Sequence, residues 1–182
     1  MGFNNEVRGV LVGRFQPPHY GHLSVVKYAL ERVDELIIVI GSPQLSHFVE
    51  NPFTAGERHF MLKKALEEAK IKAERYYIVH APDVHNNAIW VAFVVSLCPP
   101  FHIVFSNNPL VCRLFSEAGV KVEAPPLFNR EKFSATEIRK RMRLREDWRS
   151  LVPRAVVTCI EEIGGVERLC AVAQSDKQCE KG

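Results

Sequence analysis

The sequence lacks any apolar run long enough to cross a membrane. Its most apolar stretch, Ile89–Leu97, is much shorter than the roughly 20 residues that a transmembrane helix requires. Residues 1–6 also lack the basic segment followed by an apolar segment that is typical of a secretory signal peptide. We therefore expect a cytoplasmic protein that does not bind membranes.

Cysteine is scarce and has no metal-binding pattern. The five cysteines form no C-x-x-C pair and no other ligand-like spacing; they are Cys98, Cys112, Cys159, Cys170 and Cys179. A structural zinc site is therefore not expected, and no other protein-held metal is predicted. We interpret the cysteines as buried or surface thiols. A disulfide stays open, because intracellular proteins of hyperthermophiles carry them.

The excess of charge is also small. The formal net charge is +3, a mildly basic balance that suits an enzyme for phosphorylated substrates as well as a weak nucleic-acid binder. The most basic segment, Arg139–Arg145, has no aromatic side chains between its charges. We interpret it as a solvated helix face and expect no nucleic-acid partner.

What the chain does contain is a regular alternation of short apolar runs with amphipathic or capped segments. At 182 residues, 47% of them hydrophobic, it is long enough for one domain with a sizeable core. The expected strands are residues 8–13, 36–41, 76–80, 101–105 and 120–123. The expected helices are residues 21–32, 54–70, 87–97, 109–118, 134–143, 153–163 and from 165 onward.

This order predicts an α/β fold in a single domain, residues 1–182. We expect a doubly wound, Rossmann-like parallel sheet of five strands, with helices on both faces. A helical C-terminal segment should begin near residue 134, and the polar tail 174–182 is expected to fray. Right-handed crossovers place the loops that follow the strands at one edge of the sheet. Motifs in those loops should therefore converge on one site.

The most informative motif is the run GRFQPPHYGH at residues 13–22. It leads from the first strand through a Gly/Pro-rich turn into a helix, where a helix N-terminus attracts anions. His19 and His22 can face one phosphate, and protonated imidazoles would offset developing charge. Arg14 can contact phosphate oxygens through two N–H groups, and Gly13 and Gly21 would let a ligand approach the backbone. Backbone-bonded turn histidines and a surface arginine are the structural alternatives.

A second informative run is FSATEIR at residues 133–139. Ser134 and Glu137 have the spacing of a capping box, which by itself requires no ligand. A cap does not explain Thr136 and Arg139, which would add a hydroxyl and a guanidinium group at the same helix N-terminus. The run therefore indicates a second phosphate-binding element.

The segment DVHNNAIW at residues 83–90 could determine which second ligand binds beside the phosphate site. Asn87 and Trp90 are three residues apart, so on a helix they point the same way. An amide beside an indole face suits a flat, amide-bearing ring, and a cationic ring would gain about 0.5–2 kcal/mol over tryptophan. The alternative, with Trp90 in the core and Asn87 as a helix cap, is equally open.

Together these runs resemble the archaeal type of nicotinamide-nucleotide adenylyltransferase, in the nucleotidylyltransferase superfamily that carries the H-x-G-H and S-x-T-x-x-R signatures. The similarity extends over essentially residues 8–173 and includes GSPQLSHFVENPFTAGER, NNAIWV, NNPLVCRLF, PPLFNR, LVPRAV and GGVERL. Asn107 and Ala135 stand where this family usually has glycine.

The resemblance implies a role for each candidate residue. The ATP phosphates would be bound and activated by Arg14, His19, His22 and Arg139, with Ser134 and Thr136 beside them. Asn87 and Trp90 would hold the nicotinamide, and Ser106 and Asn107 would lie at the adenosine. The further substrate-binding candidates are Gly13, Phe15, Gln16, Gly21 and Asp83.

The reaction implied is ATP plus nicotinamide mononucleotide (NMN) giving NAD and pyrophosphate, with Mg²⁺ carried on the ATP phosphates. A phosphate monoester is mostly dianionic at pH 7, so it can attack without a general base. The resemblance also implies a homo-oligomer, for which a hexamer is one candidate. The alternatives are a sister enzyme that accepts nicotinate mononucleotide, phosphopantetheine or flavin mononucleotide, and a nucleotide-binding regulator without catalysis.

Overall fold

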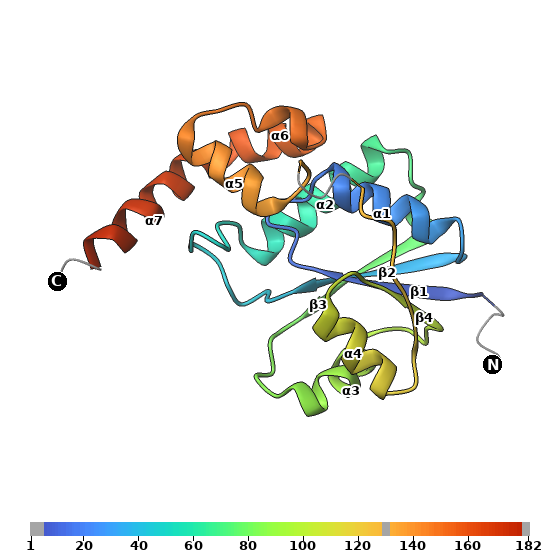
Figure 1. Cartoon of the computed structure of the whole chain (residues 1–182). Coiled ribbons are helices and arrows are strands. Elements are labelled where there is room, and N and C mark those ends of the chain that lie inside the picture. Colours follow the sequence, from blue (N-terminus) through green and yellow to red (C-terminus); the bar gives the residue numbers. More distant parts are fainter. Residues whose placement is uncertain (1–5, 129–131, 180–182) are drawn as a thin grey trace.

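The centre of the molecule is a parallel sheet of five strands in the order β3-β2-β1-β4-β5 (Figure 1). The computed structural model describes residues 6–128 and 132–179, with side chains to residue 174. The strands are β1 (Arg8–Gly13), β2 (Glu35–Gly41), β3 (Tyr76–Ala81), β4 (Ile103–Phe105) and β5 (Lys121–Glu123). This confirms the predicted doubly wound α/β fold. The strand order reverses between β1 and β4, where such sheets bind ligands.

The helices follow the predicted order, with ends that shift by a few residues. They are α1 (Tyr20–Leu30), α2 (Ala55–Glu68), α3 (Asn87–Leu97), α4 (Pro109–Glu117), α5 (Ala135–Leu144), α6 (Arg154–Glu162) and α7 (Gly165–Cys179). Two 3-10 turns, Ala73–Arg75 and Arg149–Leu151, were not predicted. Helix α7 continues to Cys179 and so includes much of the polar tail. Within the described residues no helix is long and apolar enough to span a membrane.

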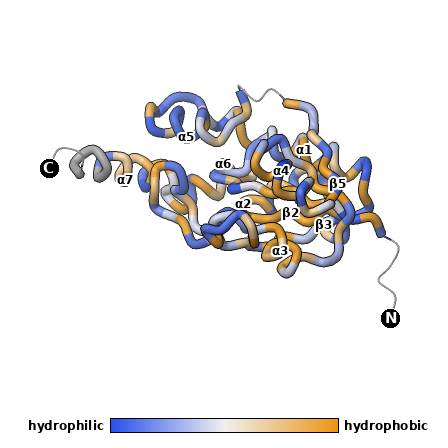
Figure 2. Tube along the Cα trace, turned by 60° about the horizontal axis from the view of Figure 1, so that its bottom comes forward, coloured by the Kyte–Doolittle hydropathy of each residue, from blue (hydrophilic) through white to orange (hydrophobic). Residues whose placement is uncertain are grey.

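Each face of the sheet has its own hydrophobic core, because alternate residues of a strand point to opposite faces. Ile38 and Ile40 of β2 pack with α1, α2 and the C-terminal helices, whereas Ile37 and Val39 pack with α3 and α4. The whole of Leu36–Ile40 is therefore buried, as expected of a parallel strand covered on both sides. Figure 2 shows the hydrophobic residues gathered along the sheet and the hydrophilic ones on α5.

Local capping explains where several helices begin. Thr54 and Glu57 form the predicted reciprocal capping box of α2. Asn108 caps α4, with Pro109 at the first helical position as predicted. At α5 the prediction is wrong in part: Ser134 accepts from the Glu137 N–H, but the Glu137 carboxylate binds Arg141 in place of closing the box.

The C-terminal helices are attached to the α2 side of the sheet. Helix α6 has no cap from its own N-terminal residue, and the Glu68 carboxylate at the end of α2 accepts its first backbone N–H groups, from Arg154 and Ala155. A second tie joins Arg168 of α7 to Glu57 at the start of α2 through two hydrogen bonds of 2.7 and 2.8 Å. Helix α5 packs on α7 and places Ile138 and Met142 in the hydrophobic core on this face of the sheet.

Candidate functional site

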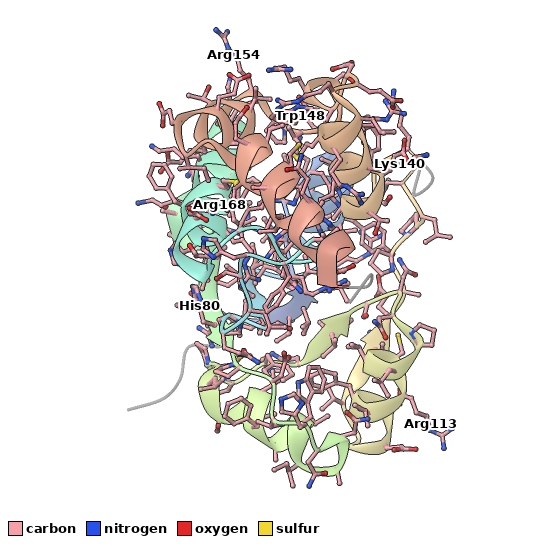
Figure 3. The ribbon with its side chains drawn as sticks, turned by 90° about the vertical axis from the view of Figure 1, so that its left-hand side faces the viewer. His80, Arg113, Lys140, Trp148, Arg154 and Arg168 are labelled. Carbon is pink, nitrogen blue, oxygen red and sulfur yellow. The ribbon has the colours of Figure 1, made fainter. Side chains whose placement is uncertain are left out.

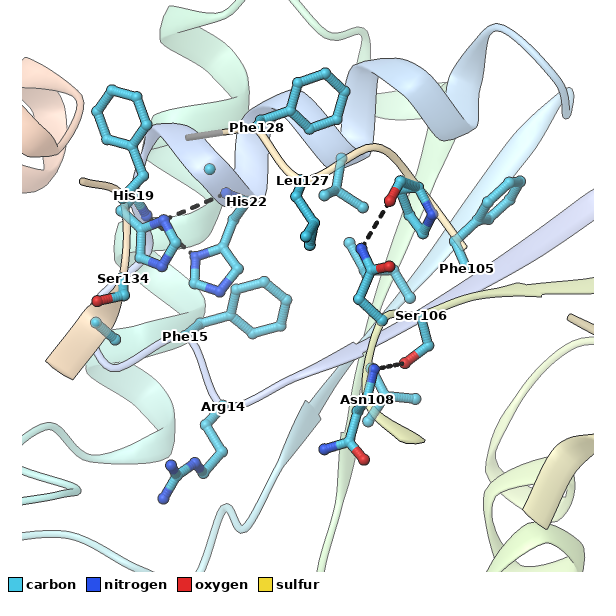
Figure 4. Close-up of a pocket in the computed structure, with 18 of the residues that line it drawn as sticks. Arg14, Phe15, His19, His22, Phe105, Ser106, Asn108, Leu127, Phe128 and Ser134 are labelled. Carbon is cyan, nitrogen blue, oxygen red and sulfur yellow. Dashed lines mark hydrogen bonds between the residues drawn. The ribbon is translucent and has the colours of Figure 1, made fainter. Parts of the chain in front are cut away.

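A cavity of about 390 Å³ opens at the carboxyl ends of β1 and β4, at the point where the strand order reverses (Figure 4). It brings together residues from the two predicted phosphate-binding runs and from the segment after β4. The predicted site residues that line it are Arg14, Phe15, Gln16, His19, Gly21, His22, Ser106, Asn107, Ser134, Thr136 and Arg139. Segments more than 100 residues apart in sequence thus form one site.

His19 and His22 cap helix α1 reciprocally. The His19 Nδ1 atom accepts from the His22 backbone N–H at 3.4 Å, and the His22 Nδ1 atom accepts from the His19 N–H at 3.2 Å. The two rings are stacked with centroids 3.7 Å apart. Because each Nδ1 is an acceptor, the proton of each neutral ring must be on Nε2. The backbone-bonded alternative is therefore correct, and the capped rings also line the cavity.

Both histidines are neutral at pH 7. Burial lowers the pKa of His19 to about 4. Burial, followed by the neighbouring His19, holds the pKa of His22 well below its ordinary value. The chemistry available is hydrogen-bond donation from two Nε2–H groups of fixed tautomer.

The lowered histidine pKa values predict that the protein loses stability as the pH falls from about 6.5 toward 4. In that interval the unfolded chain binds protons that folded His19 and His22 do not, so the free energy of unfolding should fall by up to about 1.4 kcal/mol per pH unit for each group. Urea unfolding between pH 4 and 7.5 measures this. His19→Asn keeps a side-chain acceptor at the helix cap and should reduce the slope; an unchanged slope would contradict the assignment.

The glycines of the first run make room for aromatic rings of the protein. A Cβ atom on Gly13 would lie 2.9 Å from the Phe15 ring, and one on Gly21 would lie 3.0 Å from His19 Nδ1. Gly13 does not line the cavity, so its prediction as a contact of the ligand is corrected, whereas Gly21 lies in the cavity wall. Phe15 itself is buried, in the left-handed backbone region (φ 52°), with its ring centroid 4.6 Å from that of His22. The absence of a side chain at Gly13 thus leaves room for the Phe15 ring, which packs against the ring of His22.

Two guanidinium groups supply the positive charge of the cavity. Arg14 is exposed at its mouth, whereas Arg139 of α5 is buried and donates from Nη1 to the Gln16 carbonyl at 2.9 Å. Burial lowers the pKa of Arg139, and the charge of Arg14 lowers it further, although an arginine remains protonated at neutral pH. Two cations held near one another are stabilised by an anion between them, which is the property of a polyphosphate site.

Gln16 and Ser134 act through the backbone of the protein. The Gln16 amide is buried and exchanges two hydrogen bonds with the Phe53 backbone, of 2.8 and 3.0 Å, so its side chain holds the loop before α2 in place of pointing at a ligand. Ser134 lines the cavity as the N-cap of α5. Thr136 is exposed in the first turn of that helix and leaves its hydroxyl at the cavity.

The opposite wall of the cavity was not predicted as a site. It consists of Pro125–Phe128, the loop after β5, facing Ser106–Asn108 (Figure 4). Asn107 Nδ2 donates to the Pro125 carbonyl at 2.8 Å, which ties the two segments together, and buried Ser106 accepts from the Asn108 N–H at 3.1 Å. In the sequence, PPLF contributed only to the family resemblance. Its four apolar residues in a loop were the signal that could have indicated a binding surface. Residues 129 and 130 of that motif lie outside the described residues.

Asp83, Asn87 and Trp90 do not line this cavity. They lie in a separate depression of about 330 Å³ between the loop before α3 and the start of α4. Asn86 is the N-cap of α3, so the interpretation of Asn87 as the cap is wrong, and Asn87 is exposed. Trp90 is half-buried with one edge against Phe115 of the core, at a centroid distance of 5.5 Å. The Asp83 carboxylate is fixed by Ser42 and Gln44 at 3.0 and 2.9 Å.

The described residues contain no group of three or more His, Cys, Asp or Glu side chains placed to hold a metal ion. The four cysteines whose side chains are described, Cys98, Cys112, Cys159 and Cys170, are unpaired thiols. The side chain of Cys179 lies outside the described part.

Comparison with known proteins gives the family. The model of cytidylyltransferase-like proteins matches residues 10–141. A nicotinamide-nucleotide adenylyltransferase of Methanolobus tindarius is 54% identical over 170 residues, which are 93% of this chain and 96% of that protein. The enzyme of the same name from Pyrococcus abyssi is 52% identical over 96% of this chain and 94% of its own. The chain belongs to the nicotinamide-nucleotide adenylyltransferase family. The predicted family resemblance is thereby confirmed.

Solved structures agree with the fold assigned to this family. A bifunctional NMN adenylyltransferase/ADP ribose pyrophosphatase from Francisella tularensis, complexed with AMP and a manganese ion, superposes with a TM-score of 0.75 at 21% identity. It covers 97% of this chain, which spans 56% of the length of that protein. At this identity the match establishes the fold. That structure holds a divalent metal ion together with a nucleotide.

Proposed function

We propose that this protein transfers the adenylyl group of ATP to NMN, giving NAD and pyrophosphate. The observation that carries the proposal is the joining of two neutral histidines and two arginines around one cavity at the reversal point of the sheet, in a chain about half identical to named NMN adenylyltransferases. An oxygen of the NMN 5′-phosphate attacks the α-phosphorus of ATP. The bond from that phosphorus to the β-bridging oxygen breaks, and pyrophosphate leaves with the bonding electrons.

The residues of the cavity would act by positioning and by charge stabilisation. The Nε2–H groups of His19 and His22 would donate to phosphoryl oxygens as charge moves onto the leaving group. Arg14 and Arg139 would neutralise the pyrophosphate, with Ser134 and Thr136 at the N-terminus of α5 beside it. Mg²⁺ would enter as part of the substrate MgATP, and we name no protein ligand for it. Ser106 and Asn107, with the loop 125–128, would contact the adenosine.

The depression at Asp83, Asn87 and Trp90 is the proposed acceptor side. Its aromatic wall suits the cationic pyridinium of NMN, which a tryptophan face attracts. The fixed Asp83 carboxylate would also attract that cation, and it would repel the carboxylate of nicotinate mononucleotide. We therefore propose NMN as the preferred acceptor over its acid analogue.

Trp90→Ala is expected to raise KM for NMN by about 5- to 30-fold, which is the loss of about 1–2 kcal/mol of stacking and cation–π attraction. KM for ATP should change less than twofold, because Trp90 lines the acceptor depression and not the cavity. Steady-state kinetics with each substrate varied in turn measures both. A rise in KM for ATP with no change for NMN would remove Trp90 from the acceptor site.

The test of the function is an assay of the purified protein with ATP and Mg²⁺, in which each acceptor is offered separately. The acceptors are NMN, nicotinate mononucleotide, phosphopantetheine and flavin mononucleotide, with pyrophosphate release measured and the product identified by chromatography. NAD formation with NMN as the best acceptor is expected. Turnover with another acceptor alone would assign the protein to a sister activity. ATP binding without any turnover would favour a regulator.

The expected homo-oligomer also remains part of the proposal. Helix α3 contains no charged residue, and its side chains Ile89, Val95 and Leu97 are each at least one-third exposed. Leu110 of α4, on the same side of the sheet, is also exposed. An apolar surface of this kind supports self-association. Light scattering on the protein eluting from a size-exclusion column measures the mass of the assembly. A homo-oligomer is expected, and a hexamer is the candidate that the family resemblance implies.

A further inference from the structure

Arg58 is a fully buried arginine whose hydrogen bonds all go to backbone carbonyls at the ends of structural elements. It lies on the first turns of α2 and is 0% exposed. Its Nη1 donates to the carbonyls of Arg14 at 2.8 Å and Gly41 at 2.9 Å, and its Nη2 donates to Ser42 at 3.0 Å. Its Nε donates to Thr54, the N-cap of α2, at 3.3 Å. Four of the five N–H donors of the guanidinium are therefore used.

Arg58 also has an unusual electrostatic position. Among the described residues it forms no salt bridge, and burial lowers its pKa to about 10, so it remains protonated at neutral pH. The nearby charge of Arg14 contributes to this lowering of the pKa, and the charge of Asp83 opposes it. A buried cation without an ion pair is costly and is retained where its geometry is needed. Here the geometry is a fork that joins the ends of two strands.

The acceptors of Arg58 belong to both halves of the site. The Arg14 carbonyl is on the residue whose guanidinium reaches the mouth of the phosphate cavity. The Ser42 carbonyl is on the residue whose hydroxyl holds Asp83 in the acceptor depression. Ser42 is in the left-handed region, with φ of 49°, a conformation that non-glycine residues rarely adopt and that neighbouring contacts must hold.

We propose that Arg58 is a positioning residue that sets the distance between the ATP side and the acceptor side of the active site. This role of Arg58 rests on the proposed function, because it concerns how the two substrates of that reaction are brought together. A single rigid guanidinium fixes Arg14, at the end of β1, relative to Ser42 and Asp83, at the end of β2. A shift of about 1 Å between reacting groups lowers turnover by about 100-fold, even where each substrate still binds.

The test compares Arg58→Lys and Arg58→Gln with the wild type. Lysine keeps the charge and loses the fork, and glutamine keeps two N–H donors and loses the charge. We expect kcat to fall by about 100-fold in Arg58→Lys, while calorimetric dissociation constants for ATP and for NMN, each measured alone, change less than threefold. Arg58→Gln should show the same large fall in kcat with nearly unchanged dissociation constants. It replaces Arg58→Lys in the test if the lysine variant does not fold.

Arg168→Lys is the matched control. Arg168 also binds at the start of α2, but its partners are the Glu57 carboxylate and the Pro52 carbonyl, and it lies on α7 (Figure 3). It lines neither the phosphate cavity nor the acceptor depression. This variant should lower the melting temperature and leave kcat within threefold. Unchanged kcat in both Arg58 variants, or loss of ATP and NMN binding equal to the loss of turnover, would overturn the proposal. An inactive wild-type protein would instead overturn the proposed function itself.

Discussion

His22→Ala is expected to lower kcat by about 10²- to 10³-fold, with less than a fivefold change in the dissociation constant of ATP. The loss is that of one hydrogen-bond donor directed at developing charge. His22 Nδ1 is bound to the His19 N–H, so its Nε2–H is the group available to the cavity. A donor that acts chiefly as the leaving group gains charge affects turnover more than ground-state binding. Steady-state kinetics and calorimetry with ATP separate the two quantities.

The control for this variant is His102→Ala. The His102 Nδ1 atom accepts a backbone N–H, from Arg8 at 3.1 Å, as His22 Nδ1 does, but it lies at the opposite edge of the sheet, where β1 and β4 begin. Its loss should reduce stability without changing kcat. His22→Gln can place an amide N–H near the Nε2 position and should retain more activity than His22→Asn. Equal turnover of His22→Ala and the wild type would remove His22 from the mechanism.

The order of elements was predictable because each element has a strong local signal. The strand Glu35–Gly41 contains the continuous apolar run Leu36–Ile40. The Thr54 capping box and the Asn108-Pro109 pair mark helix starts that neighbouring structure does not alter. The convergence of the two predicted runs on one cavity was predictable for a related reason. Each of these short runs joins a strand or loop to a helix, and the fold brings those junctions to one edge.

The errors concern side chains whose position depends on distant segments. Gln16 lines the cavity as expected, but its side-chain amide binds the Phe53 backbone, 37 residues further along the chain. Gly13 was expected to face a ligand, but it does not line the cavity, and a Cβ there would meet the ring of Phe15. A sequence pattern gives the residue types at a turn but not the direction in which each side chain points.

Arg58 and the loop 125–128 were missed for the same reason. In the sequence Arg58 is one charge in the mixed helical stretch Glu57–Glu68, which is typical of a solvent-exposed helix. Its burial depends on carbonyls of Arg14, Gly41 and Ser42, three residues outside its own helix. The loop 125–128 faces the cavity because Asn107 binds the Pro125 carbonyl, a contact 18 residues apart that no local motif records.

Arg139→Lys is expected to lower kcat/KM for ATP by about 30- to 100-fold. Arg139 is 6% exposed, and one of its nitrogens is already bound to the Gln16 carbonyl, so a planar fork is needed to contact that carbonyl and a phosphate together. Lysine keeps the charge but is a point donor on a flexible stem. If Arg139 holds the leaving pyrophosphate, the inhibition constant of added pyrophosphate should rise by a factor similar to the loss in kcat/KM.

The matched control is Arg143→Lys, four residues further along α5. Arg143 is exposed and lines a different depression, between α5 and α7, so the same substitution there should leave both constants within twofold. The pyrophosphate measurement decides between two roles for Arg139. A raised KM for ATP with an unchanged pyrophosphate constant would place its contact on the nucleoside or the α-phosphate. A parallel rise in both would place it on the β- and γ-phosphates, where the negative charge of the leaving group develops and where two neighbouring guanidinium groups have the greatest effect on the transition state.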